Sequence, residues 1–286
     1  DRDHPCRKPD PSGIVLSAGG ITALVLAAQR DGVPGALAER FGVSHKCLVP
    51  IGGRPLIEHV LETLSRAAVV RTIIVSIEAP EVLAANQMIA GLIHDGRLKV
   101  VRSMDNLAGS VVAAAAQARF PLLITTADNV LFPEDALATM IEDAGDADVA
   151  VAFARKGSVQ GVHAEAQRRF YEFADDGYSN CNCYWLGSAK ALHAAGIFRE
   201  GGQFAKHPMR IARAFGLFNL ILFRLGMGSL EQSFARFSRR LRLRMRPVIF
   251  DDGMLAVDVD NDRTYAVAES LMLARRNDAP DRLIAA

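Results

Sequence analysis

Apolar residues follow two alternating patterns in the first half of the chain. Short apolar runs rich in β-branched residues predict buried strands, at 21–28, 71–77, 98–102, 121–127 and 147–154. The stretches between them predict helices, with apolar residues three and four positions apart in the first, at 55–68, 81–94, 108–118 and 133–143. This alternation from 21 to about 155 predicts an α/β fold, with a mostly parallel, Rossmann-like sheet and helices on both faces.

The pattern changes after residue 155. Residues 167–186 predict two strands around the turn Asp175-Asp176-Gly177. Further elements are expected downstream: helices at 188–196 and 207–246, strands at 246–250 and 255–259, and a closing helix at 262–276. We therefore predict an N-terminal extension, 1–20, and a single domain, 21–286, in which 160–246 is an insertion that contains a helical segment.

Composition and charge exclude several classes of protein. The 286 residues carry 33 Lys and Arg against 32 Asp and Glu, a net charge of +1, and half of them are apolar. A nucleic-acid binder that relies on bulk basicity and a disordered chain are both excluded. The apolar runs fall short of the ~18 residues of a membrane span. The four cysteines form no CxxC pair, and the chain does not open on a secretory signal pattern, so we expect a cytoplasmic protein with reduced thiols.

The loop after the first predicted strand carries the first candidate chemistry. Arg30 and Lys46 lie on either side of a stretch rich in Gly and Pro. Cations among small residues suit a triphosphate, because backbone N–H groups can approach it closely and the cations neutralise its charge. A solvated surface loop explains the same residues. Neither the P-loop pattern GxxxxGK[ST] nor the dinucleotide pattern GxGxxG follows this strand.

Three short motifs in this region occur together in the order known from one family: Leu26-Ala27-Ala28-Gln29-Arg30, then Lys46, then Gly52-Gly53-Arg54-Pro55-Leu56. This order resembles the nucleotidyltransferases with a glycosyltransferase-A-like fold, which include sugar-phosphate, methylerythritol-phosphate and molybdenum-cofactor nucleotidyltransferases. The resemblance implies that Arg30 and Lys46 bind the triphosphate and stabilise the transition state. It also implies that the nucleotide lies against Leu26, Ala27, Ala28 and Gln29. Gln29 departs from the family, which usually has Gly there.

The resemblance also implies a metal site. It makes Asp128, at the end of a predicted strand, and Asp260, before the closing helix, the ligands of Mg²⁺, with Asp258 as a neighbour of Asp260. Oxygen ligands suit Mg²⁺, which retains waters and substrate phosphates in its coordination shell. From the residues alone, Asp128 could equally cap a helix, and Asp260 could belong to an acidic turn with Asn261.

Two further segments have a counterpart in the family. Gly109 and Ser110, at a predicted helix start, correspond to a turn that faces the base and ribose, although an ordinary helix start explains them too. Asn180, Asn182 and Lys206 lie in the acceptor half of the chain, and the resemblance implies that they contact the acceptor.

Together these features predict a Mg²⁺-dependent nucleotidyltransferase, with an NTP and a small molecule as its partners. It would transfer NMP from an NTP to a phosphorylated sugar, polyol or inositol and release pyrophosphate. The first half of the chain looks closest to cytidylyltransferases, which favours CMP. Two alternatives stay open: a glycosyltransferase of the same fold, and a non-catalytic nucleotide-binding protein. The sequence also leaves open whether the chain forms a homo-oligomer.

The segment 207–246 lies outside the shared motifs. Its end places six arginines within eleven residues, at 236, 239, 240, 242, 244 and 246. This pattern is compatible with a buried helical hairpin that has a solvated basic end, with peripheral contact to a membrane surface, or with binding of an anionic acceptor.

Overall fold

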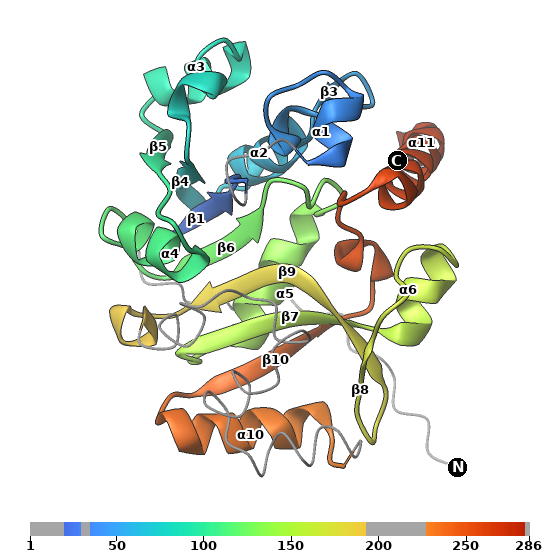
Figure 1. Cartoon of the computed structure of the whole chain (residues 1–286). Helices are drawn as coiled ribbons and strands as arrows, with labels where there is room; N and C mark the ends of the chain where they lie inside the picture. Colours follow the sequence, from blue (N-terminus) through green and yellow to red (C-terminus); the bar gives the residue numbers. More distant parts are fainter. Residues whose placement is uncertain (1–19, 30–34, 193–226, 284–286) are drawn as a thin grey trace.

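The computed structural model describes residues 20–29, 35–192 and 227–283, and its main feature is a twisted central sheet (Figure 1). In this part of the chain the strands lie in the order β10-β7-β9-β6-β1-β4-β5, and β8 pairs with β9. Their bounds are β1 (Ile21–Leu26), β4 (Val70–Ile77), β5 (Leu98–Arg102), β6 (Leu122–Thr126), β7 (Val149–Arg155), β8 (Tyr171–Glu172), β9 (Gly177–Leu186) and β10 (Met245–Phe250).

The strand directions confirm the mostly parallel sheet. β1 is parallel to β4 and to β6, β4 is parallel to β5, and β10 is parallel to β7. Among the described strands of this sheet, the antiparallel pairs all involve β9, which runs antiparallel to β6, β7 and β8. Because neighbouring parallel strands end at the same edge, the loops after β1, β4, β5 and β6 gather there, and ligands usually bind at this edge.

Helices cover both faces of the sheet. The α-helices are α1 (Ala36–Arg40), α2 (Leu56–Arg66), α3 (Gln87–His94), α4 (Leu107–Ala115), α5 (Glu134–Ala144), α6 (Lys156–Val162), α10 (Leu230–Leu241) and α11 (Asp262–Leu283). The 3₁₀ turns are η1 (Lys46–Leu48), η2 (Pro80–Leu83), η3 (Ala189–Ala191) and η6 (Gly253–Ala256). Alternate side chains of β1 point to opposite faces of the sheet. Ala23 and Val25 pack in the cluster with α2 and α5, whereas Leu24 packs with α4.

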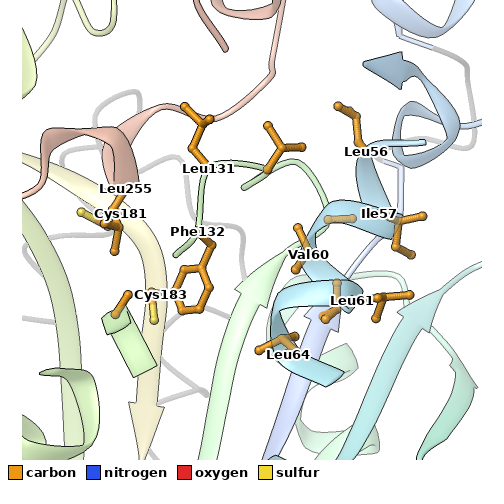
Figure 2. Close-up of a cluster of buried hydrophobic side chains, with 14 of the residues drawn as sticks. Leu56, Ile57, Val60, Leu61, Leu64, Leu131, Phe132, Cys181, Cys183 and Leu255 are labelled. Atoms are coloured by element: carbon orange, nitrogen blue, oxygen red, sulfur yellow. The ribbon is translucent and has the colours of Figure 1, made fainter. Parts of the chain in front are cut away.

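The larger core cluster lies between α2 and the sheet (Figure 2). One face of α2 is fully buried because apolar side chains recur three and four positions apart, at Leu56, Ile57, Val60, Leu61 and Leu64. Figure 2 also shows Leu131 and Phe132, which follow β6, and the buried thiols of β9, Cys181 and Cys183. This core fixes the carboxyl ends of β1 and β6 relative to α2.

The glycines of the third family motif form a tight turn. Gly52 and Gly53 both have positive φ, of 57° and 83°, and join β2 (Pro50–Ile51) to β3 (Arg54–Pro55). A two-residue hairpin turn of type I′ needs positive φ at both central positions, which glycine adopts at little cost. The local structure therefore explains the two glycines of the motif, because the tight turn directs the chain into α2.

Several predicted elements differ from the structure. Residues 255–259 form no strand, since η6 occupies 253–256 and the backbone N–H of Val259 bonds the carbonyl of Asp128 instead of a neighbouring strand. The predicted helix at 81–94 is divided into η2 and α3, because the Asn86 side chain caps a new helix start at the N–H of Ile89. Helices α1 and α6 and the β2–β3 hairpin were not predicted from the sequence.

The arginine-rich segment is a helix only in part. α10 ends at Leu241, because Arg242 adopts a left-handed conformation, and β10 already begins at Met245. Arg244 and Arg246 then pair with Asp146, at 2.6 and 3.0 Å. The helices predicted within 193–226 lie outside the described residues. Within the described ranges, no helix has the length and apolar character needed to cross a membrane.

Candidate active site

Two acidic loops meet beyond the carboxyl edge of the sheet. Asp128 follows β6, and Asp260 precedes α11, which is red in Figure 1. The backbone N–H of Val259 donates to the carbonyl of Asp128 at 3.1 Å and joins the two loops. Asp258 projects into the same place. One oxygen from each of Asp128, Asp258 and Asp260 can be chosen so that all three lie within 4.8 Å of one another.

The three carboxyl groups differ in environment. The Asp128 side chain is 17% exposed and that of Asp260 56% exposed. The pKa of Asp258 is raised well above its ordinary value by burial first, and then by the negative charges of Asp260 and Asp128. From the sequence, Asp258 is predicted only as a neighbour of Asp260. Its spacing of two residues was the available signal, because side chains two apart in extended backbone point to the same side.

Lys46 lies against this acidic cluster. Its Nζ is 2.5 Å from Asp128 Oδ2 and also bonds Asp260 Oδ1. Burial alone would lower the pKa of the Lys46 ammonium, but the charges of Asp128 and Asp260 outweigh it and raise the pKa. Three predicted site residues, from a loop after β1, a loop after β6 and the approach to α11, are therefore in contact. Lys46 itself opens η1, which the buried Cys47 anchors in the core.

The cluster fits a divalent cation. Three carboxylates converge, and hard cations prefer oxygen ligands. Asp128 Oδ1 is buried and has no hydrogen-bond partner among the residues described, which leaves a lone pair available to a metal. Asp128, Asp258 and Asp260 could therefore hold a divalent ion, with Lys46 as the adjacent cation.

Two amide side chains fix Asp258. Gln167 Nε2 donates to Asp258 Oδ1 at 3.1 Å, and Asn182 Nδ2 donates to Asp258 Oδ2 at 3.2 Å. Asn182 has φ of 48°, in the left-handed region, where β9 loses its regular register with β7. Strain of this kind persists only where the surroundings enforce it. The irregularity in β9 thus directs the Asn182 amide to the acidic cluster.

The predicted acceptor residues are only partly described. Asn182 adjoins the acidic cluster through Asp258, and Asn180 Oδ1 accepts hydrogen bonds from the backbone N–H of Asn182 and from the Tyr184 hydroxyl. Lys206 lies outside the described residues. Gln167 was not predicted as a site residue, and the sequence around it contains no motif that would indicate one.

The predicted nucleotide loop leaves β1 between two neighbouring strand ends. The N–H of Ala27 bonds the carbonyl of Ser76, and the carbonyl of Leu26 accepts from Ala127. Ala28 is exposed, and Arg30 lies outside the described residues. The structure therefore places residues 26–29 beside the Asp128 loop, and their contact with a nucleotide stays a prediction.

Gly109 and Ser110 lie in the first turn of α4, which Asn106 caps through the N–H of Gly109 at 2.8 Å. The Ser110 hydroxyl is buried and bonds the carbonyls of Met104 and Asn106, at 3.2 and 3.1 Å. The helix follows β5, at the same edge of the sheet as Asp128. Ser110 thus shapes the turn, and the predicted role of both residues in base and ribose binding stays a prediction.

Comparison with known proteins adds evidence on the family. A sequence profile of the MobA-like NTP transferase domain matches residues 23–214, well over half of the chain. The matched range includes Lys46, Asp128 and the loop after β1, but not Asp258 or Asp260. Comparison with curated proteins gives no significant match.

Solved structures share the fold. A hypothetical transferase from Thermus thermophilus is 26% identical with a TM-score of 0.71, over 86% of this chain and 99% of its own. A 4-diphosphocytidyl-2C-methyl-D-erythritol synthase from Anaerococcus prevotii is 10% identical with a TM-score of 0.52, over 89% and 96%. A Mycobacterium tuberculosis protein solved in complex with manganese is 16% identical with a TM-score of 0.51, over 89% and 100%. The last two likenesses concern the fold alone.

Proposed function

Because this chain belongs to the family of MobA-like NTP transferases, a branch of the nucleotidyltransferases with a glycosyltransferase-A-like fold, we propose that it transfers a nucleotidyl group from an NTP to a phosphorylated small molecule. Pyrophosphate is the second product. The observation that carries the proposal is the contact of Lys46 with Asp128 and Asp260, at the edge of the sheet where ligands bind. It combines a cation that can neutralise part of the charge of a triphosphate with carboxylates that could hold a metal ion.

The proposed reaction is one displacement at the α-phosphorus of the NTP. A phosphate oxygen of the acceptor forms a bond to the α-phosphorus, and the bond from that phosphorus to the bridging oxygen of the β-phosphate breaks. An acceptor phosphate dianion has no proton to lose, so the reaction needs no general base. The protein therefore has to align the two substrates and neutralise charge.

Lys46 supplies part of that charge. Its ammonium stabilises the negative charge that develops on the leaving pyrophosphate, and Arg30 has the same role by the resemblance of the loop motif. Asp128, Asp258 and Asp260 would hold the metal, for which we propose Mg²⁺. When bound, Mg²⁺ supplies positive charge to phosphate oxygens and orients them.

We propose CTP as the favoured donor, because the first half of the chain looks closest to cytidylyltransferases. The acceptor is a sugar, polyol or inositol phosphate. Asn182 contacts the acidic cluster from the side of β9, and Asn180 bonds the backbone of Asn182, which supports a role for both on the acceptor side. Lys206 belongs to the same proposal by its position in the chain, within the predicted insertion 160–246 of a single domain.

The decisive experiment is a matrix of four NTPs against sugar, polyol and inositol phosphates with Mg²⁺, with pyrophosphate release as the readout. We expect release that requires both an NTP and one class of acceptor, and CTP should be the best donor. Pyrophosphate release with GTP but not with CTP would overturn the proposal that CTP is the donor. Cleavage of a nucleotide-sugar without pyrophosphate release would indicate the glycosyltransferase, and nucleotide binding without turnover would indicate the non-catalytic protein.

The basic end of the insertion offers a separate proposal, which is peripheral contact with anionic lipid. Its support is the basic face of α10, which carries Arg239 and Arg240 in the last helical turn. Co-sedimentation with liposomes, with and without anionic lipid, tests it. Liposome binding that does not depend on anionic lipid would overturn this proposal.

A further inference from the structure

Gln29 occupies the position at which this chain departs from the loop motif of its family, and its side chain contacts the segment that carries Lys46. Gln29 Nε2 donates to the carbonyl of Ser44 at 2.9 Å. Gln29 Oε1 accepts from the backbone N–H of Lys46 at 3.4 Å. Both halves of one carboxamide are thus directed at the backbone on either side of His45.

The backbone of His45 explains why one amide can make both contacts. His45 is extended, with φ of −134° and ψ of 141°. In extended backbone, the carbonyl of one residue and the N–H of the residue two positions later point to the same side. The Gln29 carboxamide therefore pairs with Ser44 and Lys46 much as a neighbouring strand would.

The contact also compensates for a poorly capped turn. η1 comprises only Lys46–Leu48, and the side chain of its N-cap residue, His45, makes no capping bond. The first N–H groups of a helical turn have no partner within the turn. Gln29 Oε1 accepts from the first of them, at Lys46, and so acts as a cap from another part of the chain.

Glu78 closes the arrangement from the end of β4. Its carboxylate accepts from the backbone N–H of Gln29, at 3.1 and 3.2 Å, and lies 3.4 Å from Nε2 of the buried His45. The main chain of Gln29 and the side chain of His45 are thus held by the same group. Glu78 in this way fixes Gln29 relative to the sheet, and the side chain of Gln29 in turn holds the backbone of Lys46.

We infer that Gln29 is a positioning residue for Lys46: its carboxamide sets the backbone from which the Lys46 ammonium reaches the phosphates of the nucleotide. This inference rests on the proposed function, since it concerns the same site. An amine on a long flexible side chain contributes fully to catalysis only if the backbone that carries the side chain is held in place, because a misplacement of about 1 Å can cost on the order of 100-fold in rate. In this chain Gln29 supplies the constraint where the family usually has Gly.

The test measures binding of magnesium pyrophosphate by titration calorimetry, because this probe depends neither on the base nor on the acceptor. Gln29→Met retains the length of the side chain and loses both hydrogen bonds. We expect Gln29→Met to weaken binding by about tenfold, since the cost is a fraction of that for removing the cation itself. Gln117→Ala, in the exposed turn that follows α4, is the matched control and should bind as the wild type does.

A double-mutant cycle with Lys46→Met separates positioning from other roles. If Gln29 acts through Lys46, Gln29→Met causes no further loss when Lys46 is already Met. Losses that multiply would show that Gln29 acts independently and would overturn the inference. So would equal binding by the wild type and Gln29→Met. A wild-type chain that binds neither magnesium pyrophosphate nor any NTP would instead overturn the proposed function, and this inference with it.

Discussion

Lys46 Nζ lies 2.5 Å from Asp128 Oδ2, although the two residues are 82 positions apart in the sequence. Parallel strands bring them together, because β1 and β6 are neighbours and their following loops share one edge of the sheet. Asp260 joins them from a third part of the chain. The ammonium therefore neutralises part of a cluster that holds three carboxyl groups, and the charge balance of this cluster leads to the first two predictions.

Replacement of Lys46 should abolish most turnover. We expect Lys46→Met to lower the rate of pyrophosphate release by on the order of 100-fold or more, by analogy with loss of one oxyanion-stabilising donor. The fold should persist, because the Lys46 side chain is partly exposed beyond the edge of the sheet and is not part of the apolar core. Lys156→Met is the matched control, since Lys156 forms an exposed ion pair with Glu172 that contributes little to stability. Near-normal turnover of Lys46→Met would contradict the assigned role.

The same substitution should strengthen metal binding in the absence of nucleotide. The Lys46 ammonium contacts two of the carboxylates that would hold the ion. It therefore competes with the cation for these carboxylate oxygens, and its positive charge repels the cation. Its removal should raise the affinity for Mn²⁺ by about tenfold or more, because close charge pairs interact by several kcal/mol even when partly screened. Titration followed by electron paramagnetic resonance of free Mn²⁺ measures this. An unchanged or lower affinity would show that the metal binds elsewhere.

The acidic residues have the opposite effect on the metal. Asp128→Asn should weaken Mn²⁺ binding by at least about tenfold, since it replaces a carboxylate whose buried Oδ1 has no other partner among the described residues. Asp146→Asn serves as the control, because Asp146 is exposed and pairs with Arg244 and Arg246 far from the cluster. If the two variants bind Mn²⁺ equally well, the acidic cluster is not the metal site.

Much of this arrangement could be predicted from the sequence because strand order and strand ends leave a strong local signal. The apolar runs that end just before Gln29 and Asp128 predicted β1 and β6, and the family motifs singled out Lys46 and Asp260. That Asp258 belongs to the acidic cluster was harder to predict from the sequence, because its position depends on packing against β9. No local pattern predicts that Gln167 or Asn182 reaches Asp258, because these contacts join segments 91 and 76 residues apart.

The end of α10 shows a different limit of sequence reasoning. The arginines of 236–246 fit a continuous helix by composition, yet the chain turns at Arg242 and continues as β10. Pairing with β7 stabilises this strand, and Arg244 gains Asp146 and Asp148 as partners. Tertiary contacts of this kind override helix propensity, which is worth only fractions of a kcal/mol per residue.

Asn129 connects the loop that carries Asp128 to β9, and its loss should destabilise the protein. Its buried Nδ2 donates to the carbonyl of Cys181 at 3.0 Å and to Thr125 Oγ1 at 3.3 Å. Asn129→Ala would leave a buried carbonyl without its donor, so we expect the free energy of unfolding to fall by about 1–3 kcal/mol. Urea denaturation measures the change. Gln117→Ala, on the surface, should stay within about 0.5 kcal/mol of the wild type, and an equally small effect of Asn129→Ala would contradict the structure.

His59 should make stability depend on pH. Its ring is buried in α2, where Nε2 faces the carbonyl of Ile51 at 2.9 Å and Nδ1 faces an N–H of Arg54 at 3.2 Å. A carbonyl can only accept and a guanidinium can only donate, so these contacts require the neutral ring with its proton on Nε2. Burial, and then the charge of Arg54, lower the pKa of His59 in the folded protein below the ordinary value of 6.5.

The sign of the pH effect follows from this lowered pKa. Above about pH 6.5 the ring is neutral in both the folded and the unfolded chain, and its contribution to stability is complete. As the pH falls below that value, the unfolded chain binds a proton that the folded chain resists, so stability is lost down to the folded pKa. We therefore expect the urea midpoint of the wild type to fall between pH 7.5 and 5 by more than that of His59→Gln, which can keep one donor and one acceptor. His94→Gln, at the exposed end of α3, controls for the loss of a histidine. Parallel midpoints for the wild type and His59→Gln across this range would show that the ring takes up its proton as easily in the folded protein as in the unfolded chain.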